Sequence, residues 1–413
     1  MVGGGGREHA MCMALSAGDV ATIAAPGNPG TAAIARNVDI AADDIDALVS
    51  VARSEDVTLV VPGPEVPLVA GLADALAAAG IPCCGPSAAA ARLEGSKVFT
   101  RVLAAEAGVP GPRYRIVRDT DDFAAAVDAF DAPPVVKADG LAGGKGVSLP
   151  NTMDECRREV RHLLDGRLGD AGASVVLEER LVGVEASLFY ACRGLEAVPL
   201  PHAKDHKRLG TGDLGPNTGG MGAMSPNPIV DASLERVVAD TIVAPTLAAI
   251  ARRGAPFSGF LYAGLMLTRD GPRLLEFNVR LGDPEAQVIL PRLESDAFVE
   301  TCRWVAGLRT DPPTVGVDRR PTCGVVVASE GYPGTPRRGD PIAVDPTLAT
   351  SDRWFIHAGT ALDAGTLVTA GGRVGAVVAR GRTANEARRR AYDGVALVSF
   401  PGMTIRTDIG ETA

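Results

Sequence analysis

Hydrophobic and polar positions along the first hundred residues predict short strands that alternate with helices. Apolar runs over 20–28 and 57–65 end in Pro/Gly turns, an alanine-rich helix spans 67–80, and 81–87 forms a further short strand and turn. This alternation predicts a doubly wound parallel sheet. Ligands of such sheets bind beyond the carboxyl ends of the strands, so we expect the loops at 3–8, 26–28 and 63–65 to converge there.

A different pattern begins near Gly95. A helix is predicted over 96–108, with Ser96 as its N-cap and Gly108 as its stop. The remaining predicted elements are strands over 113–119, 133–140, 173–181 and 185–194, a helix over 152–166, two strands joined by a turn over 259–283, two helical stretches to about Leu308, a proline-rich linker over 309–321, and a strand-rich unit from about Cys323 with one helix over 383–398. We therefore expect an α/β and α+β multidomain fold with domains over 1–95, 96–310 and 315–413.

Composition narrows the class of protein. The 413-residue chain has a net charge of −9 and no apolar run that approaches the length of a membrane span. We expect a soluble protein with no nucleic-acid and no membrane partner. Seven cysteines without a C-x-x-C pair, and the absence of a secretory signal, favour reduced thiols in the cytoplasm.

Lysine is rare, which makes its positions informative. The five lysines are Lys97, Lys137, Lys145, Lys204 and Lys207, and arginine takes nearly every other basic position. Lys137 and Lys145 belong to "KADGLAGGKGV", a glycine-rich loop that follows a predicted strand. Glycines let backbone N–H groups cradle phosphate oxygens, and a lysine neutralises their charge. Gly146 and Val147 follow Lys145, without the Ser or Thr that follows a P-loop lysine, so the sequence predicts a different nucleotide loop that covers its ligand.

One face of a predicted strand has the residues for a metal site. Glu276 and Asn278 are two positions apart in "LLEFNVRLGDPE", so both point to one face, and Arg280 follows on that face. A carboxylate and an amide oxygen suit Mg²⁺, which takes its other ligands from phosphate and water. Arg280 is placed to clamp a transferring phosphoryl group.

Two further stretches offer polar groups for ligands. Glu178, Glu179 and Glu185 lie around a strand end and can accept hydrogen bonds from an adenine amine or ribose hydroxyls, although exposed glutamates there usually have no chemical role. Residues 204–226 are rich in glycine and polar side chains and are predicted to be irregular. Long irregular segments inside domains are often functional, and the backbone of 218–222 suits a small zwitterion.

These motifs together resemble the phosphoribosylamine–glycine ligase family (glycinamide ribonucleotide synthetases) of the ATP-grasp superfamily. The similarity runs almost end to end and includes "GGREHA", "APGNPGT", "LEGSK", "VVKADGLAGGKGV", "GPNTGGMGAMSP", "EFNVRLGDPEAQ", "FIHAGT" and "GGRVGAVVA". The resemblance implies a doubly wound N-terminal domain that binds phosphoribosylamine, ATP-grasp domains in which 113–188 cover ATP, and a strand-rich C-terminal domain. It also implies a cytoplasmic enzyme that acts on small molecules, and we expect a monomer.

The implied reaction is ligation of glycine to 5-phosphoribosylamine, with ATP activating glycine as an acyl phosphate. No protein nucleophile is needed, which fits a chain without a Ser/His/Asp or Cys/His signature. The implied ATP residues are Lys97 and Lys137 at the phosphates, Gly143, Gly144 and Lys145 in the covering loop, Glu178, Glu179 and Leu181 at the adenine, and Glu185 at the ribose. Glu276 and Asn278 would hold Mg²⁺ or Mn²⁺.

The resemblance also implies the substrate and catalytic residues. Those for glycine and its acyl phosphate are Asp205, Lys207, Asn217, Thr218, Gly219, Gly220, Met221, Gly222 and Asp283. Those for phosphoribosylamine are Gly5, Gly6, Arg7, Asn28 and Glu65. The implied catalytic groups are Arg280, Lys145, Asp205 and Lys207.

The first strand is shorter than the family usually has, since only Met1 and Val2 precede the glycines. We expect either that the native start lies a few codons upstream or that the chain was trimmed. If Met1 is the native start, we expect a loosened first loop and weak binding of phosphoribosylamine.

Three alternatives remain open at this stage. An oxidoreductase with a dinucleotide in the first loop is disfavoured, because "GGGGREH" lacks the third glycine and no acidic residue ends the second strand. A degenerate ligase that only binds is disfavoured by Lys137, Glu276, Asn278 and Arg280. A sibling ATP-grasp ligase with another acid substrate is the remaining alternative.

Overall fold

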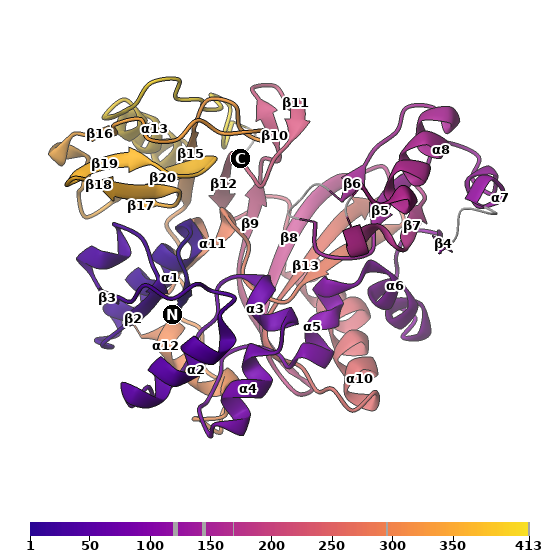
Figure 1. The fold of residues 1–413 in the computed structure, drawn as a ribbon, viewed down its shortest axis with the longest axis horizontal. Helices are drawn as coiled ribbons and strands as arrows, with labels where there is room; N and C mark the ends of the chain where they lie inside the picture. Colours follow the sequence, from indigo (N-terminus) through magenta and orange to yellow (C-terminus); the bar gives the residue numbers. More distant parts are fainter. Residues whose placement is uncertain (119–122, 143–145, 168, 295, 412–413) are drawn as a thin grey trace.

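A computed structural model describes residues 1–118, 123–142, 146–167, 169–294 and 296–411 (Figure 1). Its N-terminal part is a parallel sheet flanked by helices. The strands are β1 (Val2–Gly3), β2 (Ile23–Pro26) and β3 (Arg36–Asn37), and the helices are α1 (Gly6–Ala17), α2 (Ile45–Ser54), α3 (Glu65–Val69), α4 (Leu72–Ala78) and α5 (Ala88–Gly95). Parallel bridges from Val2 to Pro62 and from Val60 to Cys83 extend the sheet beyond β1, as the alternation predicts.

The prediction of a single helix over 67–80 is wrong, because the structure has two helices there, α3 and α4. Gly71 has a φ of 95°, and this left-handed residue separates α3 from α4. Glycine reaches that conformation without the steric cost that a side chain would add. The alanine-rich run is therefore interrupted at Gly71, the glycine inside it, well before Gly80 at its end.

A small four-stranded sheet projects to one side, in the order β4-β7-β5-β6 (Figure 1). Its strands are β4 (Tyr114–Val117), β5 (Val135–Ala138), β6 (Val147–Ser148) and β7 (Val175–Glu178), and its helices are α7 (Phe123–Asp128) and α8 (Met153–His162). Helix α6 (Lys97–Glu106) leads into it. Ser96 caps α6 by accepting a hydrogen bond from the Phe99 N–H at 3.0 Å, and Gly108 ends the turn with a φ of 69°, so both predicted boundaries are confirmed.

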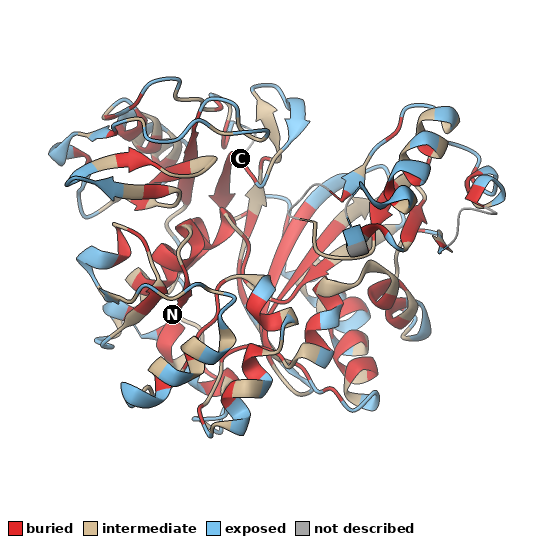
Figure 2. Ribbon diagram, viewed as in Figure 1, coloured by how far each residue is buried: buried red, intermediate tan, exposed pale blue. Residues whose placement is uncertain are grey.

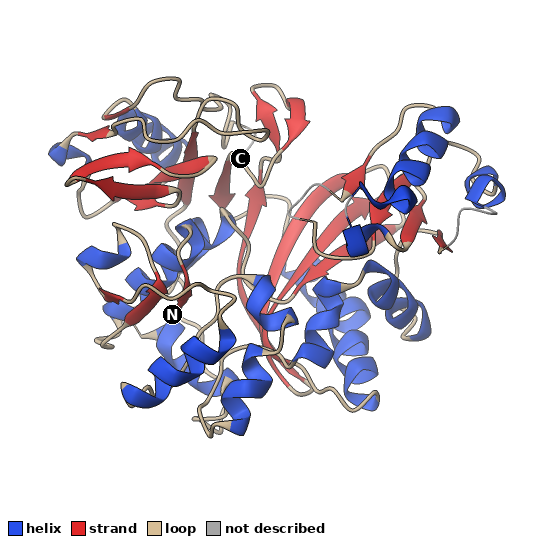
Figure 3. Ribbon diagram, viewed as in Figure 1, coloured by secondary structure: helices blue, strands red, loops and turns tan. Residues whose placement is uncertain are grey.

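The largest sheet has eight strands in the order β14-β13-β8-β9-β12-β15-β20-β17. Its long strands run through the middle of the molecule, with helices beside them (Figure 3). Five come from the middle of the chain: β8 (Val184–Arg193), β9 (Glu196–Asp205), β12 (Gly222–Ser225), β13 (Ser258–Thr268) and β14 (Gly271–Asn278). Leu188 and Tyr190 of β8 enter one core with α6 and α10 (Ala244–Arg252), and Phe189 and Ala191 enter another with α1 and α12 (Ala297–Val305). Both faces of the sheet are therefore buried, as the red centre of Figure 2 shows.

The C-terminal segment continues this sheet. Strand β15 (Thr322–Ala328) pairs antiparallel with β12, followed by β20 (Arg373–Arg380) and β17 (Arg353–His357). Val326 and Val378 share a core with Met11 and Val288, so all three parts of the chain pack together. The other elements are α9 (Ala232–Val238), α11 (Glu285–Ile289), α13 (Ala384–Val395), β16 (Ala343–Val344), β18 (Thr360–Asp363), β19 (Thr366–Thr369) and β21 (Val398–Ser399).

The prediction of an irregular segment over 204–226 is also wrong. It contains the end of β9, the hairpin of β10 (Arg208–Gly210) and β11 (Leu214–Asn217), and β12. All four residues of β11 are exposed, so the strand has no alternation of buried and polar positions to reveal it. None of the helices in the described ranges is long and apolar enough to cross a bilayer.

Candidate active site

The three N-terminal loops converge as the sequence predicts. The Asn28 Nδ2 donates to the Gly4 carbonyl at 2.9 Å, and the Gly5 N–H donates to Glu8 Oε2 at 2.6 Å. A side chain at Gly63 would overlap the Glu8 carboxylate, so glycine is required at this close approach. Hydrogen bonds thus hold the first loop in place, and the weak binding of phosphoribosylamine stays a prediction.

A buried group of charges, which we call the nucleotide cluster, consists of Arg101, Lys137 and Glu178. Glu178 receives two bonds from Arg101, at 2.5 and 2.9 Å, and lies 2.9 Å from Lys137 Nζ. Arg101 and Lys137 also donate to the Leu275 carbonyl, which ties the cluster to β14. Burial would raise the pKa of Glu178, but the charges of Lys137 and Arg101 hold it below its usual value. The cluster has one net positive charge.

The two predicted metal ligands lie next to this cluster at the end of β14. Burial would raise the pKa of Glu276, but Lys137, Lys97 and Lys207 outweigh that effect and hold it low. Asn278 Oδ1 accepts one bond from Arg280 at 3.1 Å, which leaves its second lone pair free. An ionised carboxylate and an amide oxygen amid positive charge fit a hard divalent cation that also binds phosphate.

Arg280 joins the end of β14 to the N-terminal part. It lies 2.8 Å from Glu94 and 3.2 Å from Glu65, and Glu94 also accepts from the Val279 N–H. Burial would lower the pKa of Arg280, but Glu94 and Glu65 raise it above its usual value, so the guanidinium stays charged. Arg280 is therefore held in one orientation, with its charge balanced by carboxylates.

Two loops meet close to the end of β14, since a Cβ added at Gly220 would overlap Pro284; we call 217–222 and 281–285 the substrate loops. Asp205 lies 2.6 Å from Lys207 Nζ, and the Lys207 carbonyl accepts from the Thr218 N–H at 2.8 Å, so the structure brings these predicted residues together. Glu285 is 1 % exposed, and its Oε1 has no hydrogen-bond partner. Burial and then the nearby Asp205 raise its pKa.

The C-terminal segment reaches both substrate loops. Arg373 Nη1 donates to the carbonyls of Gly219 and Asp283, each at 2.7 Å, and its Nη2 lies 2.9 Å from Asp283 Oδ2. The Tyr332 hydroxyl accepts from the Gly219 N–H at 2.9 Å. Arg7 of α1 donates to the Leu281 carbonyl at 3.2 Å. Segments from three parts of the chain therefore meet at these loops.

The other predicted residues are placed as follows. Lys97 begins α6, and its N–H donates to the Asp139 carbonyl at 3.0 Å. The Glu179 N–H donates to the Arg113 carbonyl at 2.9 Å, and Glu185 lies on β8, where burial raises its pKa. Gly143, Gly144 and Lys145 of the covering loop lie outside the described residues.

Sequence reasoning missed Arg101, Glu94, Glu285 and Arg373. Arg101 lies within the helix predicted over 96–108 and has no distinctive spacing, so no local signal identifies it. Glu94 precedes that helix in the matched motif "LEGSK". Glu285 and Arg373 lie in "GDPE" and "GGRVGAVVA", two of the matched motifs, and a closer reading of those motifs would have found them.

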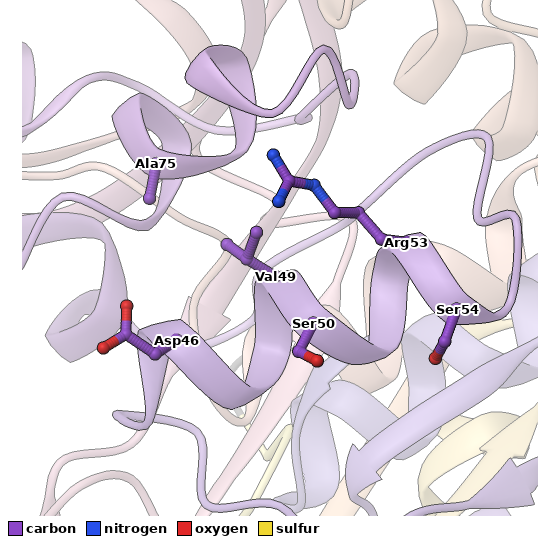
Figure 4. A pocket seen from close by; sticks show the side chains of 6 residues that line it. All are labelled: Asp46, Val49, Ser50, Arg53, Ser54 and Ala75. Atoms are coloured by element: carbon purple, nitrogen blue, oxygen red, sulfur yellow. The ribbon is translucent and has the colours of Figure 1, made fainter.

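A separate hollow of about 570 Å³ lies on α2 and α4 (Figure 4). It is lined by Asp46, Val49, Ser50, Arg53, Ser54 and Ala75, none of which takes part in the contacts above. The charged groups suited to ATP and an amino acid are elsewhere, so we do not assign the chemistry to this hollow.

Models of the three parts of one family match the chain in order. The phosphoribosylglycinamide synthetase N domain matches residues 1–94, its ATP-grasp (A) domain 95–286 and its C domain 322–412. The chain belongs to the phosphoribosylglycinamide synthetase family. The resemblance drawn from the motifs is therefore confirmed, and Arg373 and Tyr332 lie in the part that matches the family's C domain.

Relatives in this family match over the full length. A phosphoribosylamine–glycine ligase of Rhizobium meliloti is 46% identical over 412 residues, covering 99% of this chain and 97% of its own, and one of Brucella melitensis is 45% identical over 413 residues, covering 99% and 96%. The crystal structure of a phosphoribosylamine–glycine ligase from Thermotoga maritima is similar with a TM-score of 0.86 and 32% identity, covering 99% of this chain and 98% of that one. The predicted multidomain fold is thereby confirmed.

Proposed function

We propose that the chain ligates glycine to 5-phosphoribosylamine with consumption of ATP, a reaction of purine biosynthesis. The observation that carries the proposal is that Lys137 of the nucleotide cluster and Arg280 both act on the charge of Glu276, and that Arg280 contacts the Leu281 carbonyl of a substrate loop. The chain also matches this family end to end. Phosphate-binding charge on one side and an amino-acid site on the other are what an acyl phosphate mechanism requires.

The first step joins an oxygen of the glycine carboxylate to the γ-phosphorus of ATP, and ADP leaves with the bridging oxygen. The second joins the amine nitrogen of phosphoribosylamine to the glycyl carbonyl carbon, while phosphate leaves and the amine loses a proton. The chain supplies position and charge in both steps and no covalent nucleophile. Water has to be excluded between the steps, because it would hydrolyse the acyl phosphate.

We assign the nucleotide to the side of the small sheet. Lys97 and Lys137, with Lys145 in the covering loop, neutralise phosphate charge, Glu178, Glu179 and Leu181 line the adenine, and Glu185 binds the ribose. The buried pair of Glu178 and Lys137 supports this assignment, because it holds the lysine toward β14 at the level of Glu276.

We assign the divalent cation, Mg²⁺ or Mn²⁺, to Glu276 and Asn278. The described residues contain no group of three or more His, Cys, Asp or Glu suited to a metal, which agrees with an ion that takes most of its ligands from phosphate and water. When bound, this ion screens the charge of the transferring phosphoryl group.

We assign glycine and its acyl phosphate to the space between Arg280 and the substrate loops. Arg280 faces the phosphoryl and carboxylate oxygens, and Asp205 and Glu285 face the ammonium group. The unpartnered Oε1 of Glu285 supports this, since a buried carboxyl oxygen without a donor is costly and an ammonium would supply one. We assign phosphoribosylamine to the three N-terminal loops, at Gly5, Gly6, Arg7, Asn28 and Glu65.

We also propose that the protein is a cytoplasmic monomer with domains over 1–95, 96–310 and 315–413. The boundaries rest on the changes in sequence pattern near Gly95 and over 309–321. Residues 113–188 would close over ATP.

The direct test is an assay of ADP release with ATP, Mg²⁺ and phosphoribosylamine, with and without glycine. We expect release that depends on both glycine and phosphoribosylamine. Release that is independent of glycine, or that needs another acid, would overturn the proposal, and the second result would favour a sibling ATP-grasp ligase.

A further inference from the structure

Arg373 is the first residue of β20, far along the chain from the substrate loops that it contacts. It donates to the carbonyl of Gly219 at 2.7 Å in one loop and to that of Asp283 at 2.7 Å in the other. A longer bond of 3.5 Å goes to the Gly220 carbonyl. One guanidinium therefore bridges 217–222 and 281–285.

The charge of Arg373 is used within the protein. Its Nη2 pairs with Asp283 at 2.9 Å, and although burial would lower the pKa of Arg373, Asp283 raises it above its usual value. In turn Arg373 keeps the pKa of Asp283 low against the effect of burial. Because the pair is neutral and the Arg373 donors reach carbonyls of both loops, Arg373 is suited to hold the loops together.

Tyr332 supports the same contact from an adjacent position. Its hydroxyl accepts from the Gly219 N–H at 2.9 Å. Its ring fills the space at Gly372, where an added Cβ would lie 2.9 Å from the ring Cε2. Tyr332 and the residue before Arg373 are thus packed together, so the backbone N–H and carbonyl of Gly219 are both bound by the C-terminal segment.

We propose that Arg373, with Tyr332, is a positioning residue that holds the two substrate loops together around the acyl phosphate. The inference rests on the proposed function. If the loops separate, a water oxygen bonds to the glycyl carbonyl carbon and phosphate leaves, which regenerates glycine and consumes ATP. Loss of Arg373 should therefore uncouple ADP release from ligation, in addition to weakening glycine binding.

The test compares Arg373→Ala, Arg373→Lys and Tyr332→Phe with the parent chain. The matched control is Arg380→Ala, at the other end of β20: its side chain is 23% exposed against 20% for Arg373, and it donates to the carbonyls of Pro291 and Ser351. The measured quantities are KM for glycine, kcat, ATP affinity and the ratio of ADP released to product ligated.

We expect Arg373→Ala to raise KM for glycine about tenfold or more, because hydrogen bonds to a charged group are lost. The ratio of ADP released to product ligated should rise above one, and added guanidinium should lower it back toward one. The affinity for ATP should stay near that of the parent. Arg373→Lys keeps a cationic partner for Asp283, so its KM for glycine and its ADP-to-product ratio should lie between those of the parent and those of Arg373→Ala. Tyr332→Phe should give a smaller change in the same direction, and Arg380→Ala should behave as the parent.

A coupling ratio and KM for glycine unchanged in Arg373→Ala would overturn the inference, as would an equal effect in Arg380→Ala. If Arg373→Ala does not fold, parental coupling and KM in both Arg373→Lys and Tyr332→Phe would overturn it. Absence of ligation by the parent chain would instead reject the proposed function, so the two failures are distinguishable.

Discussion

The nucleotide cluster and the substrate loops differ in how the chain assembles them. Arg101, Lys137 and Glu178 come from the stretch that matches one family domain, and they bond mostly to one another and to β14. The substrate loops receive Arg7 from the N-terminal part and Arg373 from the C-terminal part. The nucleotide cluster thus forms within one domain of the chain, whereas the substrate loops depend on the packing of three segments. Changes on the substrate side should therefore spare ATP binding.

The largest effect is expected from Glu276→Ala, which removes the carboxylate shared by both sides. Its loss removes a negative charge that Lys137, Lys97 and Lys207 balance, and it removes the proposed metal ligand. We expect kcat to fall about a thousandfold or more, while the fold stays largely intact. Steady-state kinetics and thermal unfolding measure the two quantities. Asp270→Ala, in the exposed turn of the same hairpin, is the control, and near-normal turnover in Glu276→Ala would remove this residue from the metal site.

The next largest effect concerns stability on the nucleotide side. Arg101→Ala removes two bonds to Glu178 and two to the carbonyls of Leu274 and Leu275. The free energy of unfolding should fall by about 3–5 kcal/mol, because four hydrogen bonds from a buried guanidinium are lost, although Glu178 keeps Lys137 as a partner. Chemical denaturation measures this change. Arg157→Ala, which breaks half-exposed pairs with Asp128 and Asp154, should have a much smaller effect on the free energy of unfolding. Equal losses in the two variants would argue against a tightly paired cluster.

A smaller and more selective effect is expected at Gly220. Its φ is 114°, and an added Cβ would overlap Pro284 Cδ and lie 2.7 Å from Asp205 Oδ1. Gly220→Ala should push the substrate loops apart and raise KM for glycine about tenfold or more, with ATP affinity unchanged. Gly254→Ala is the control, since Gly254 has a φ of 77° but no neighbour within 4 Å. If both variants had the same kinetics, the close contact at Gly220 would not matter for the substrate.

The smallest effect is a pH dependence at the contact between α1 and β17. The His357 N–H donates to His9 Nδ1 at 2.9 Å; burial, and for His9 also the neighbouring His357, lower the pKa of each imidazole to about 4. Unfolded histidine has a pKa of about 6.5, so the unfolded state binds more protons between pH 6.5 and 4. The contribution of these two histidines to the free energy of unfolding is therefore fully present above pH 6.5. It is lost as the pH falls from 6.5 toward 4.

His9→Asn keeps an acceptor for the His357 N–H but cannot titrate. Between pH 6.5 and 4, the free energy of unfolding of this variant should fall less than that of the parent, by up to about 3 kcal/mol. This difference follows from the lowered pKa of His9, at about 1.36 kcal/mol for each pKa unit. Denaturation at a series of pH values measures the slopes. Identical slopes in the two proteins would show that His9 does not titrate on unfolding in this range.

The same contrast explains what the sequence could predict. Glu276 and Asn278 lie two positions apart in one contiguous motif, and both lie at the end of β14. Lys137 lies near the end of β5, before the glycines of its motif, as the sequence predicts. Arg101 and Glu94 lie in helices, and only tertiary packing brings them to Glu178 and Arg280. The exposed strand β11 and the break at Gly71 were missed because a strand without buried positions, and a glycine in an alanine-rich run, leave the hydrophobic pattern unchanged.

The most direct test of the contrast is calorimetric titration of Gly220→Ala/Arg373→Ala with ATP and Mg²⁺, alongside its ligation rate. We predict an ATP Kd within about threefold of the parent, because the altered residues share no partner with the nucleotide cluster. Ligation should fall to about a hundredth or less, as two positioning contacts are lost. ATP binding that weakened in parallel with ligation would contradict the account, because the two sides would then form a single unit.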